Sequence, residues 1–255
     1  MIQFPSSRPA LIAYVTCGDP DLATTRGVVL AAIDAGVDVV ELGVPFSDPV
    51  ADGPVIQRAS ERALANGVTL EDVLKLAASI RRRTKAGLIM FSYFNPVLQY
   101  GLDRFAKTAA ASGVDGALIT DLTVEEAGPY LRSMRGRKLA TVFLAAPTST
   151  DARLRAIARA STGFVYAVSR TGVTGTRKQL TGSARSLVRR LRKFTKLPIA
   201  LGFGISTPAQ FREAGRFADA VVVGSAIVQT IERSGRRKAA SAVAKLIAKY
   251  LVPGT

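Results

Sequence analysis

The sequence predicts an α/β protein of one domain, residues 1–255, in which eight strand–helix units close into a (β/α)8 barrel, the TIM barrel. Three observations predict this class. Eight short apolar segments alternate with amphipathic segments along the whole chain. The apolar segments have no consistently polar face, which is typical of parallel strands that are covered by helices. The length of 255 residues also matches a single-domain barrel.

The apolar segments define the expected strands at residues 10–15, 39–44, 88–92, 116–120, 140–146, 163–169, 198–204 and 219–224. Amphipathic segments lie between them, and the clearest expected helices span 22–36, 69–84 and 151–161. Several expected helices begin at a residue type that caps helix N-termini, namely Asp21, Thr69, Asp151 and Thr207. Several are followed by a glycine suited to a left-handed helix end, namely Gly36, Gly113 and Gly163.

An open, doubly wound sheet is the alternative architecture. Such a sheet normally carries a glycine-rich dinucleotide-binding turn after its first strand. Here that turn reads TCGDPD, residues 16–21, which is not the dinucleotide fingerprint. No linker separates a second domain, and the longest insertion outside the strand–helix units is the loop 45–54. We therefore expect the closed barrel.

Composition narrows the chemistry and the location. No stretch approaches the roughly 18 unbroken apolar residues of a membrane span, and the first residues lack the pattern of a signal peptide. Cys17 is the only cysteine, so no disulfide framework is expected and a reducing cytoplasm fits. Histidine is absent, which removes the usual general base and the commonest metal ligand. Acid–base chemistry must then fall to carboxylates, tyrosine or lysine.

The net charge of +16, from 35 basic against 19 acidic residues, raises the question of an acidic partner or nucleic acid. The basic residues cluster at 81–85, 132–138, 185–196 and 232–238, in or beside expected helices. Aromatic residues do not interleave with them, and no nucleic-acid motif is present. We interpret the clusters as solvated helix faces and keep a basic nucleic-acid-binding barrel as a remote alternative.

Strand alternation singles out Glu41. Val40, Leu42 and Val44 share one face of the second expected strand and should meet the helices. Glu41 and Gly43 share the other face, so Glu41 is expected inside the barrel near its mouth, with Gly43 leaving space above it. A carboxyl group in that place is poorly solvated, its pKa should rise, and it could carry a proton near neutral pH. The alternative is a salt-bridged structural glutamate.

Three further residues are candidates on weaker grounds. Asp48 and Asp52 lie on the proline-rich loop that follows the second strand, at the expected mouth of the barrel. A loop acid is often only solvated, and Asp52 could instead cap a helix that begins near Pro54. Tyr166 lies in the sixth strand on the face of Phe164, where a core role and a role in the site both remain open.

Glycine-rich turns predict a phosphate site. Gly202 and Gly204 end the seventh strand, and Gly224 and Ser225 end the eighth, directly before a helical pattern. Loops after these two strands, with a helix N-terminus, form the usual phosphate site of a barrel. The sixth loop, residues 169–182, is long, polar and glycine-rich, and we interpret it as a mobile lid over the mouth.

Most of these residues lie in segments that resemble one family, the tryptophan synthase alpha subunit. The similar segments follow one another along the chain in the family's order. They are YVTCGDPD (14–21), ELGVPFSDPVADGPVIQ (41–57), NPVLQYG (95–101), APTSTD (146–151), SRTGVTG (169–175), GFGIS (202–206) and GSAIV (224–228). The second is the most specific of them. The resemblance implies a lyase of tryptophan biosynthesis that cleaves indole-3-glycerol phosphate to indole and glyceraldehyde 3-phosphate by a retro-aldol reaction.

The resemblance also assigns roles to the acidic loop and its neighbours. Glu41 matches the acid–base residue that moves a proton between a glyceryl hydroxyl and indole C3. Asp52 matches the residue that takes the indole N–H and stabilises the protonated indole. Asp48 matches a position of partner contact, and Tyr166 matches a tyrosine near Glu41.

For the other end of the substrate, the resemblance implies phosphate contacts at Gly175, Gly204, Gly224 and Ser225. Thr174 matches a lid residue that meets Asp52 when the lid closes. No metal or cofactor is implied in this chain, because the pyridoxal phosphate of the family belongs to the beta subunit. The implied partner is that beta subunit, in an alpha2beta2 assembly.

One departure concerns the N-terminus. The family usually has an amphipathic helix before the first strand, whereas here the first strand begins near Ala10, so that helix is missing or shortened. A stand-alone lyase that releases free indole shares every catalytic residue with the alpha subunit. The sequence therefore leaves that alternative open.

Overall fold

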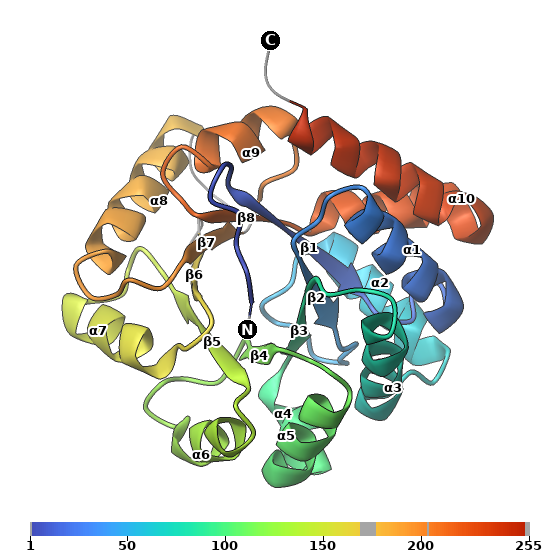
Figure 1. Cartoon of the computed structure of the whole chain (residues 1–255), viewed down its shortest axis with the longest axis horizontal. Helices are drawn as coiled ribbons and strands as arrows, with labels where there is room; N and C mark the ends of the chain where they lie inside the picture. Colours follow the sequence, from blue (N-terminus) through green and yellow to red (C-terminus); the bar gives the residue numbers. More distant parts are fainter. Residues whose placement is uncertain (1, 169–176, 203, 253–255) are drawn as a thin grey trace.

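The computed structural model describes residues 2–168, 177–202 and 204–252, without the side chains of residues 177–181. Its eight parallel strands pair in sequence order, and β1 also pairs with β8, so the sheet closes into a barrel with the helices around it (Figure 1). The predicted (β/α)8 class is confirmed, and the open sheet is excluded.

Each strand begins within two residues of the predicted segment. The strands are β1 (Ala10–Thr16), β2 (Val39–Gly43), β3 (Gly87–Ser92), β4 (Gly116–Ile119), β5 (Ala140–Ala145), β6 (Val165–Val168), β7 (Ile199–Gly202) and β8 (Ala220–Val223). The helices are α1 (Leu22–Asp34), α2 (Pro54–Ala65), α3 (Leu70–Arg81), α4 (Phe94–Tyr100), α5 (Leu102–Ala111), α6 (Gly128–Gly136), α7 (Asp151–Ala160), α8 (Arg177–Leu191), α9 (Pro208–Ala214) and α10 (Ser225–Leu251).

Strand alternation divides the core into two layers. Val40 and Leu42 of β2 belong to the cluster between strands and helices, whereas Val39 belongs to the cluster inside the barrel. Glu41 shares the inward face with Val39 and has no exposed surface. The interior also holds Tyr14 of β1 and Tyr166 of β6.

Most of the predicted caps are present. The Asp21 side chain accepts the backbone N–H of Thr24, and Thr69 and Thr207 each form a capping box. Asp151 was wrongly assigned, because Thr150 caps α7 and Asp151 is its first helical residue. Gly36 and Gly113 have positive φ, as expected.

The φ of Gly163 is not positive, so the prediction of a left-handed helix end at this residue was wrong. A Cβ at Gly163 would lie 3.0 Å from the Cβ of Ala140 and 3.1 Å from Ile2. The glycine is therefore required by close packing at the bottom of the barrel. In the sequence, a glycine required by close packing cannot be told from one required by a positive φ.

Residues 2–9 form no helix. Ile2 and Phe4 pack against the interior cluster instead, and the ring of Phe4 meets that of Phe164 edge-on at 5.8 Å. In Figure 1 the N-terminus lies over the centre of the ring of strands. An extended segment thus covers the bottom of the barrel.

Aspartates placed just before a strand join neighbouring strands at this bottom end. Each accepts the backbone N–H of a residue in the preceding strand and pairs with an arginine. The groups are Asp38 with Leu11 and Arg8, Asp115 with Leu88 and Arg81, and Asp219 with Ile199 and Arg192. Between β5 and β6, Thr162 accepts the N–H of Thr141 at 3.0 Å in the same way.

Candidate active site at the barrel mouth

Glu41 is buried without compensation. Its Cα lies in register with Tyr14 of β1 and Ile89 of β3. Neither carboxylate oxygen has a hydrogen-bond partner within the described residues. Burial raises the pKa of Glu41 from an ordinary value of 4.5 to about 8. The salt-bridged alternative finds no partner in the part of the chain described, and the group can exchange a proton near neutral pH.

Two tyrosines fill the barrel above the strand glycines. A Cβ at Gly43 would lie 2.4 Å from the Tyr14 hydroxyl oxygen, so that phenol occupies the space that Gly43 was expected to leave above Glu41. A Cβ at Gly202 would lie 2.0 Å from the Tyr166 hydroxyl oxygen. Gly202, expected to belong to a phosphate turn, is therefore a strand residue that makes room for Tyr166.

Asp52 is half-buried on the loop after β2, and its Oδ2 accepts a hydrogen bond of 3.0 Å from the Tyr93 hydroxyl. That hydroxyl also accepts the backbone N–H of Ala51 at 3.0 Å. Helix α2 begins at Pro54 as expected, but its N-cap is Gly53 and no side chain caps it. Asp52 is thus not a cap. Gln57 of α2 donates to the Asp52 carbonyl oxygen at 2.9 Å and holds its backbone.

Tyr93, at the end of β3, was missed by the sequence reasoning. Its hydroxyl fixes the orientation of the Asp52 carboxylate, and its ring packs 5.0 Å from that of Phe46 on the same loop. The available signal was its position, because residues directly after a barrel strand lie at the mouth. An aromatic residue in that place reads equally well as core.

The ionisable groups at the mouth influence one another. Burial raises the pKa of Asp52 to about 6, and the hydrogen bond from Tyr93 opposes this rise. Burial also raises the pKa of Tyr14 and Tyr166 well above the ordinary value, and the charges of Asp52 and Glu41 add to both. The two phenols therefore stay neutral, and all four groups lie within electrostatic range of one another.

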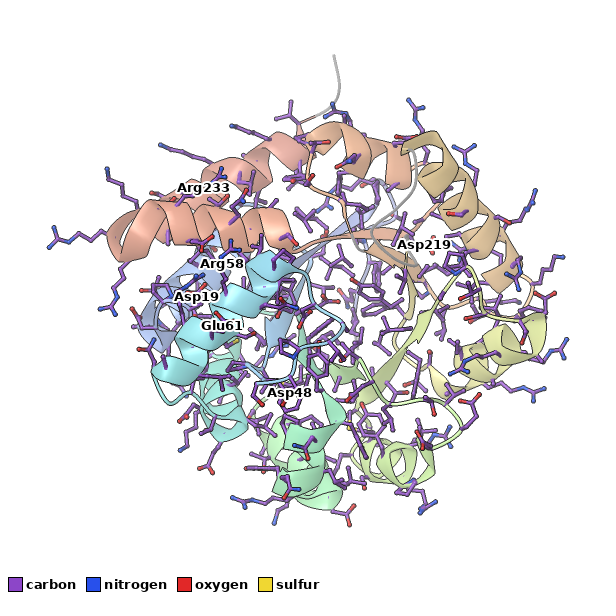
Figure 2. The ribbon with its side chains drawn as sticks, turned by 180° about the vertical axis from the view of Figure 1, so that it is seen from behind. Asp19, Asp48, Arg58, Glu61, Asp219 and Arg233 are labelled. Atoms are coloured by element: carbon purple, nitrogen blue, oxygen red, sulfur yellow. The ribbon has the colours of Figure 1, made fainter. Side chains whose placement is uncertain are left out.

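Asp48 is exposed on the same loop (Figure 2), and the Ser47 hydroxyl donates to its Oδ2 at 2.7 Å. Val50 beside it has 85% of its surface exposed. An apolar side chain and an acid thus stand together in solvent at the rim, apart from the buried carboxylates.

The predicted phosphate residues are partly described. Gly224 is the N-cap of α10 and Ser225 its first residue, so backbone N–H groups point out of the helix start there. Gly204 is exposed with φ of +78°. Thr174 and Gly175 lie outside the described residues, as does the predicted lid over 169–176. Residues 177–182 belong to α8, so the predicted loop 169–182 was too long.

Among the described residues, no three or more histidine, cysteine, aspartate or glutamate side chains gather in a way that could hold a metal. The described helices also include none long and apolar enough to cross a membrane.

Comparison with known proteins gives one consistent result. The family model described as tryptophan synthase alpha chain matches residues 3–251. The tryptophan synthase alpha chain of Solibacter usitatus is 55% identical over 233 residues, 91% of this chain and 87% of that one. That of Geobacter sulfurreducens is 48% identical over 228 residues, 89% of this chain and 86% of the other.

Solved structures agree with the sequence comparison. An aminoacrylate-bound tryptophan synthase from M. tuberculosis has a TM-score of 0.85 at 37% identity, covering 95% of this chain and 94% of that chain. A tryptophan synthase complex from Pyrococcus furiosus has a TM-score of 0.86 at 36% identity, covering 98% and 99%. The barrel, the buried acid at its mouth and these likenesses agree: the chain belongs to the tryptophan synthase alpha chain family.

Proposed function

We propose that this chain is the alpha subunit of a tryptophan synthase, a carbon–carbon lyase that cleaves indole-3-glycerol phosphate to indole and glyceraldehyde 3-phosphate. The observation that carries the proposal is Glu41, a buried carboxyl group without a hydrogen-bond partner among the described residues, placed inside the mouth of a barrel of this family. Nothing in the described packing explains such a group. A proton-transfer role does.

In the proposed reaction Glu41 serves as the proton carrier. Protonation of indole C3 turns the ring into a leaving group. The glyceryl carbon bonded to C3 carries a hydroxyl. When that hydroxyl loses its proton and the carbon–carbon bond breaks, this carbon becomes the aldehyde carbon of glyceraldehyde 3-phosphate. Because the two atoms are neighbours on the substrate, one carboxyl group can serve both. A pKa of about 8 keeps the protonated and ionised forms of Glu41 accessible near neutral pH.

Asp52 is proposed to accept the indole N–H. Its negative charge then stabilises the positive charge that C3 protonation places on the ring. The hydrogen bond from Tyr93 orients the carboxylate, and Gln57 holds the backbone that carries it. Tyr166 is proposed to contact the substrate beside Glu41, and Thr174 to meet Asp52 from the sixth loop.

Phosphate is proposed to bind at Gly175, Gly204, Gly224 and Ser225, mainly through backbone N–H groups at the start of α10. Replacing Gly224 with valine should weaken inorganic phosphate binding at least about tenfold, because a branched side chain would stand in the approach to these groups. A Cβ there lies no closer than 3.4 Å to Tyr14, so the fold should persist. Calorimetric titration with phosphate measures the effect.

The control is Gly128→Val, at the first residue of α6 on another side of the barrel, where a Cβ meets only the Arg132 side chain at 3.7 Å. That variant should bind phosphate like the unchanged protein. Equal affinity in the Gly128 and Gly224 variants would place the phosphate elsewhere.

The proposed partner is a tryptophan synthase beta subunit, in an alpha2beta2 assembly. The Pyrococcus furiosus neighbour is described as a tryptophan synthase complex, and its alpha-like chain is covered almost completely by this one. Asp48 and the exposed Val50 are proposed to form part of the contact at the rim of the mouth. Membership of this family makes a stand-alone lyase the less favoured reading.

An assay of the purified chain tests the function. We expect it to release glyceraldehyde 3-phosphate from indole-3-glycerol phosphate slowly when alone and faster with a beta subunit, because a partner that binds the active conformation better shifts the chain toward it. A coupled dehydrogenase assay of the aldehyde measures both rates. Absence of cleavage in both conditions contradicts the proposal, and full speed without the partner favours the stand-alone lyase.

A nucleic-acid-binding role gains no support from the surface. Charged side chains project outward from helices around the whole ring in Figure 2, and Arg58, Arg153 and Arg190 are among those already paired with acids.

We propose that residues 1–255 form one domain that works in the cytoplasm, as suits a biosynthetic enzyme.

A further inference from the structure

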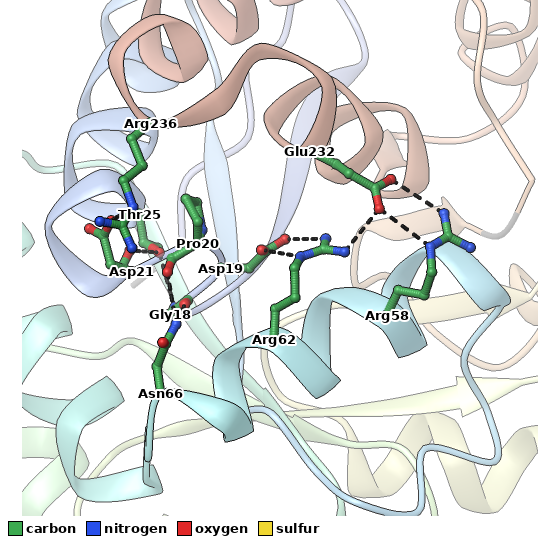
Figure 3. A network of polar contacts seen from close by, with 10 residues as sticks. All are labelled: Gly18, Asp19, Pro20, Asp21, Thr25, Arg58, Arg62, Asn66, Glu232 and Arg236. Carbon is green, nitrogen blue, oxygen red and sulfur yellow. Dashed lines mark hydrogen bonds and ion pairs between the residues drawn. The ribbon is translucent and has the colours of Figure 1, made fainter.

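An ion pair between a buried aspartate and a partly exposed arginine lies beside the mouth, outside the proposed catalytic groups. Asp19 follows β1, and only 2% of its side chain is exposed. Arg62 of α2 binds it through two parallel hydrogen bonds, Nε to Oδ1 at 2.7 Å and Nη2 to Oδ2 at 2.8 Å (Figure 3). This two-point geometry fixes direction as well as distance. Helix α2 is therefore held in one orientation relative to the loop between β1 and α1.

The same arginine reaches a third element. Its Nη1 donates to Oε1 of Glu232 in α10 at 2.9 Å, and Arg58, one turn earlier in α2, donates to both oxygens of Glu232 at 3.3 Å. Figure 3 shows Arg62 between the two carboxylates. One guanidinium group thus connects the loop after β1, helix α2 and helix α10. We call Asp19, Arg58, Arg62 and Glu232 the clamp.

Further contacts support the clamp on its flanks. Asn66, at the end of α2, donates to the carbonyl oxygen of Pro20 at 2.8 Å. Helix α10 breaks at Gly235, where φ is 64°, and Arg236 just beyond the break pairs with Asp21 at 3.1 Å. Glu232 thus fastens the first part of α10, residues 225–234, to α2, and Arg236 fastens the part after the break to the N-cap of α1.

The elements that the clamp joins carry opposite ends of the proposed substrate site. Helix α2 starts two residues after Asp52 and holds its carbonyl oxygen through Gln57. Helix α10 starts at Ser225, at the proposed phosphate position. The clamp therefore links the helix that begins beside Asp52 to the helix that begins at Ser225.

We propose that Arg62 is a positioning residue, which sets the spacing between Asp52 and the N-terminus of α10 so that both ends of one substrate are held at once. The inference rests on the proposed function. The arginines of the clamp are 34% and 47% exposed, and ion pairs of partly exposed arginines contribute little to stability, whereas misplacement of a reacting group by about 1 Å can cost about a hundredfold in rate. The effect of the clamp is therefore expected in two-ended binding more than in folding.

The test compares two lysine variants. Arg62→Lys keeps the positive charge near Asp19 and removes the fork. Arg8→Lys is the matched control, because Arg8 also binds an aspartate through two hydrogen bonds, of 2.7 Å and 2.9 Å to Asp38, at the bottom of the barrel. The exposed fractions of the two side chains are alike, 34% for Arg62 and 36% for Arg8. Glu232→Gln serves as a milder variant that weakens only the α10 side and keeps the buried pair.

The probes are inorganic phosphate, which occupies one end, and an indole joined to phosphate by a propyl chain, which occupies both. Arg62→Lys should weaken the two-ended probe by about tenfold to a hundredfold and raise KM with a fall in kcat, while phosphate alone changes less than about twofold. Glu232→Gln should shift the two-ended probe in the same direction by less. Arg8→Lys should change neither probe.

Equal losses for both probes in Arg62→Lys, or no loss in either, overturn the proposal, as does an Arg8→Lys effect of the same size. Hydrogen exchange provides a readout that does not require the proposed reaction. Amides of residues 48–54 and 224–228 should exchange faster in Arg62→Lys than in Arg8→Lys. If the unchanged protein neither binds the indole probe nor cleaves indole-3-glycerol phosphate, the proposed function fails, and unchanged exchange then rejects the clamp separately.

Discussion

Glu41→Gln should lower kcat for indole-3-glycerol phosphate cleavage by at least about a hundredfold while leaving KM nearly unchanged. Glutamine has the same shape, and the carboxylate it replaces makes no hydrogen bond to a described residue, so little packing is lost. What is lost is the proton that moves between the glyceryl hydroxyl and indole C3. Steady-state kinetics measures the effect, with the exposed Glu61→Gln as control. Near-normal turnover in Glu41→Gln would remove Glu41 from the mechanism.

Glu41→Gln should also change how the free energy of unfolding depends on pH, in a direction set by the raised pKa of Glu41. The pKa of Glu41 is raised in the folded state, from 4.5 to about 8, so folding favours the protonated form. The unfolded chain releases that proton as pH rises above 4.5, and the folded protein loses stability until pH passes about 8. Glu41→Gln should become progressively more stable than the unchanged protein across this window, by on the order of 5 kcal/mol at its upper end. Denaturant unfolding at several pH values measures this difference.

Asp52→Asn should also cause a large loss of turnover, of about a hundredfold or more, with a smaller loss of substrate affinity. The amide keeps the size of the carboxylate and can still face the indole N–H, but it lacks the charge that stabilises the protonated ring. Single-turnover kinetics separates the chemical step from binding. A structure with an indole phosphate bound and Asp52 directed into solvent would contradict the assignment.

Tyr93→Phe should perturb the Asp52 carboxylate more mildly than Asp52→Asn does. The hydrogen bond from Tyr93 lowers the pKa of Asp52, which burial otherwise raises to about 6. Its loss should raise that pKa further, so the acid limb of the kcat/KM profile should move to higher pH while activity above it is largely kept. An unchanged acid limb would mean that the limb reports another group.

The inward position of Glu41 was predictable because successive side chains of a barrel strand alternate between the interior and the helices. Val40, Leu42 and Val44 are apolar and can only face the helices, which turns Glu41 inward whatever the neighbouring loops do. The N-terminus of α10 was predictable for a similar reason, since glycine and serine directly after a strand mark a turn into a helix. Both inferences use local patterns that long-range packing does not alter.

Tyr93, the Tyr14–Gly43 contact and the clamp were not predictable in this way. Tyr93 reaches Asp52 across 41 positions of the chain, and Arg62 reaches Glu232 across 170. Residues so far apart meet only after the barrel has closed. The residue types in such a pair also occur at many positions that make no comparable contact. The surplus of arginine hid Arg62 further, because one functional cation looks the same as many solvated ones.

The aspartates at the bottom of the barrel have a consequence for how the molecule is built. Side-chain fastenings join β1 to β2, β3 to β4, β5 to β6 and β7 to β8. At the intervening seams the backbone carbonyl oxygens of Asp38, Asp115 and Asp219 take the matching N–H groups of Gly87, Ala140 and Ala10. The side-chain link thus recurs at every second seam of the barrel, with Thr162 in place of aspartate between β5 and β6, as a repeated two-stranded unit would produce. Each half of the chain, β1 to β4 and β5 to β8, contains two such pairs of strands, and the halves meet where the Ala140 N–H donates to the backbone oxygen of Asp115.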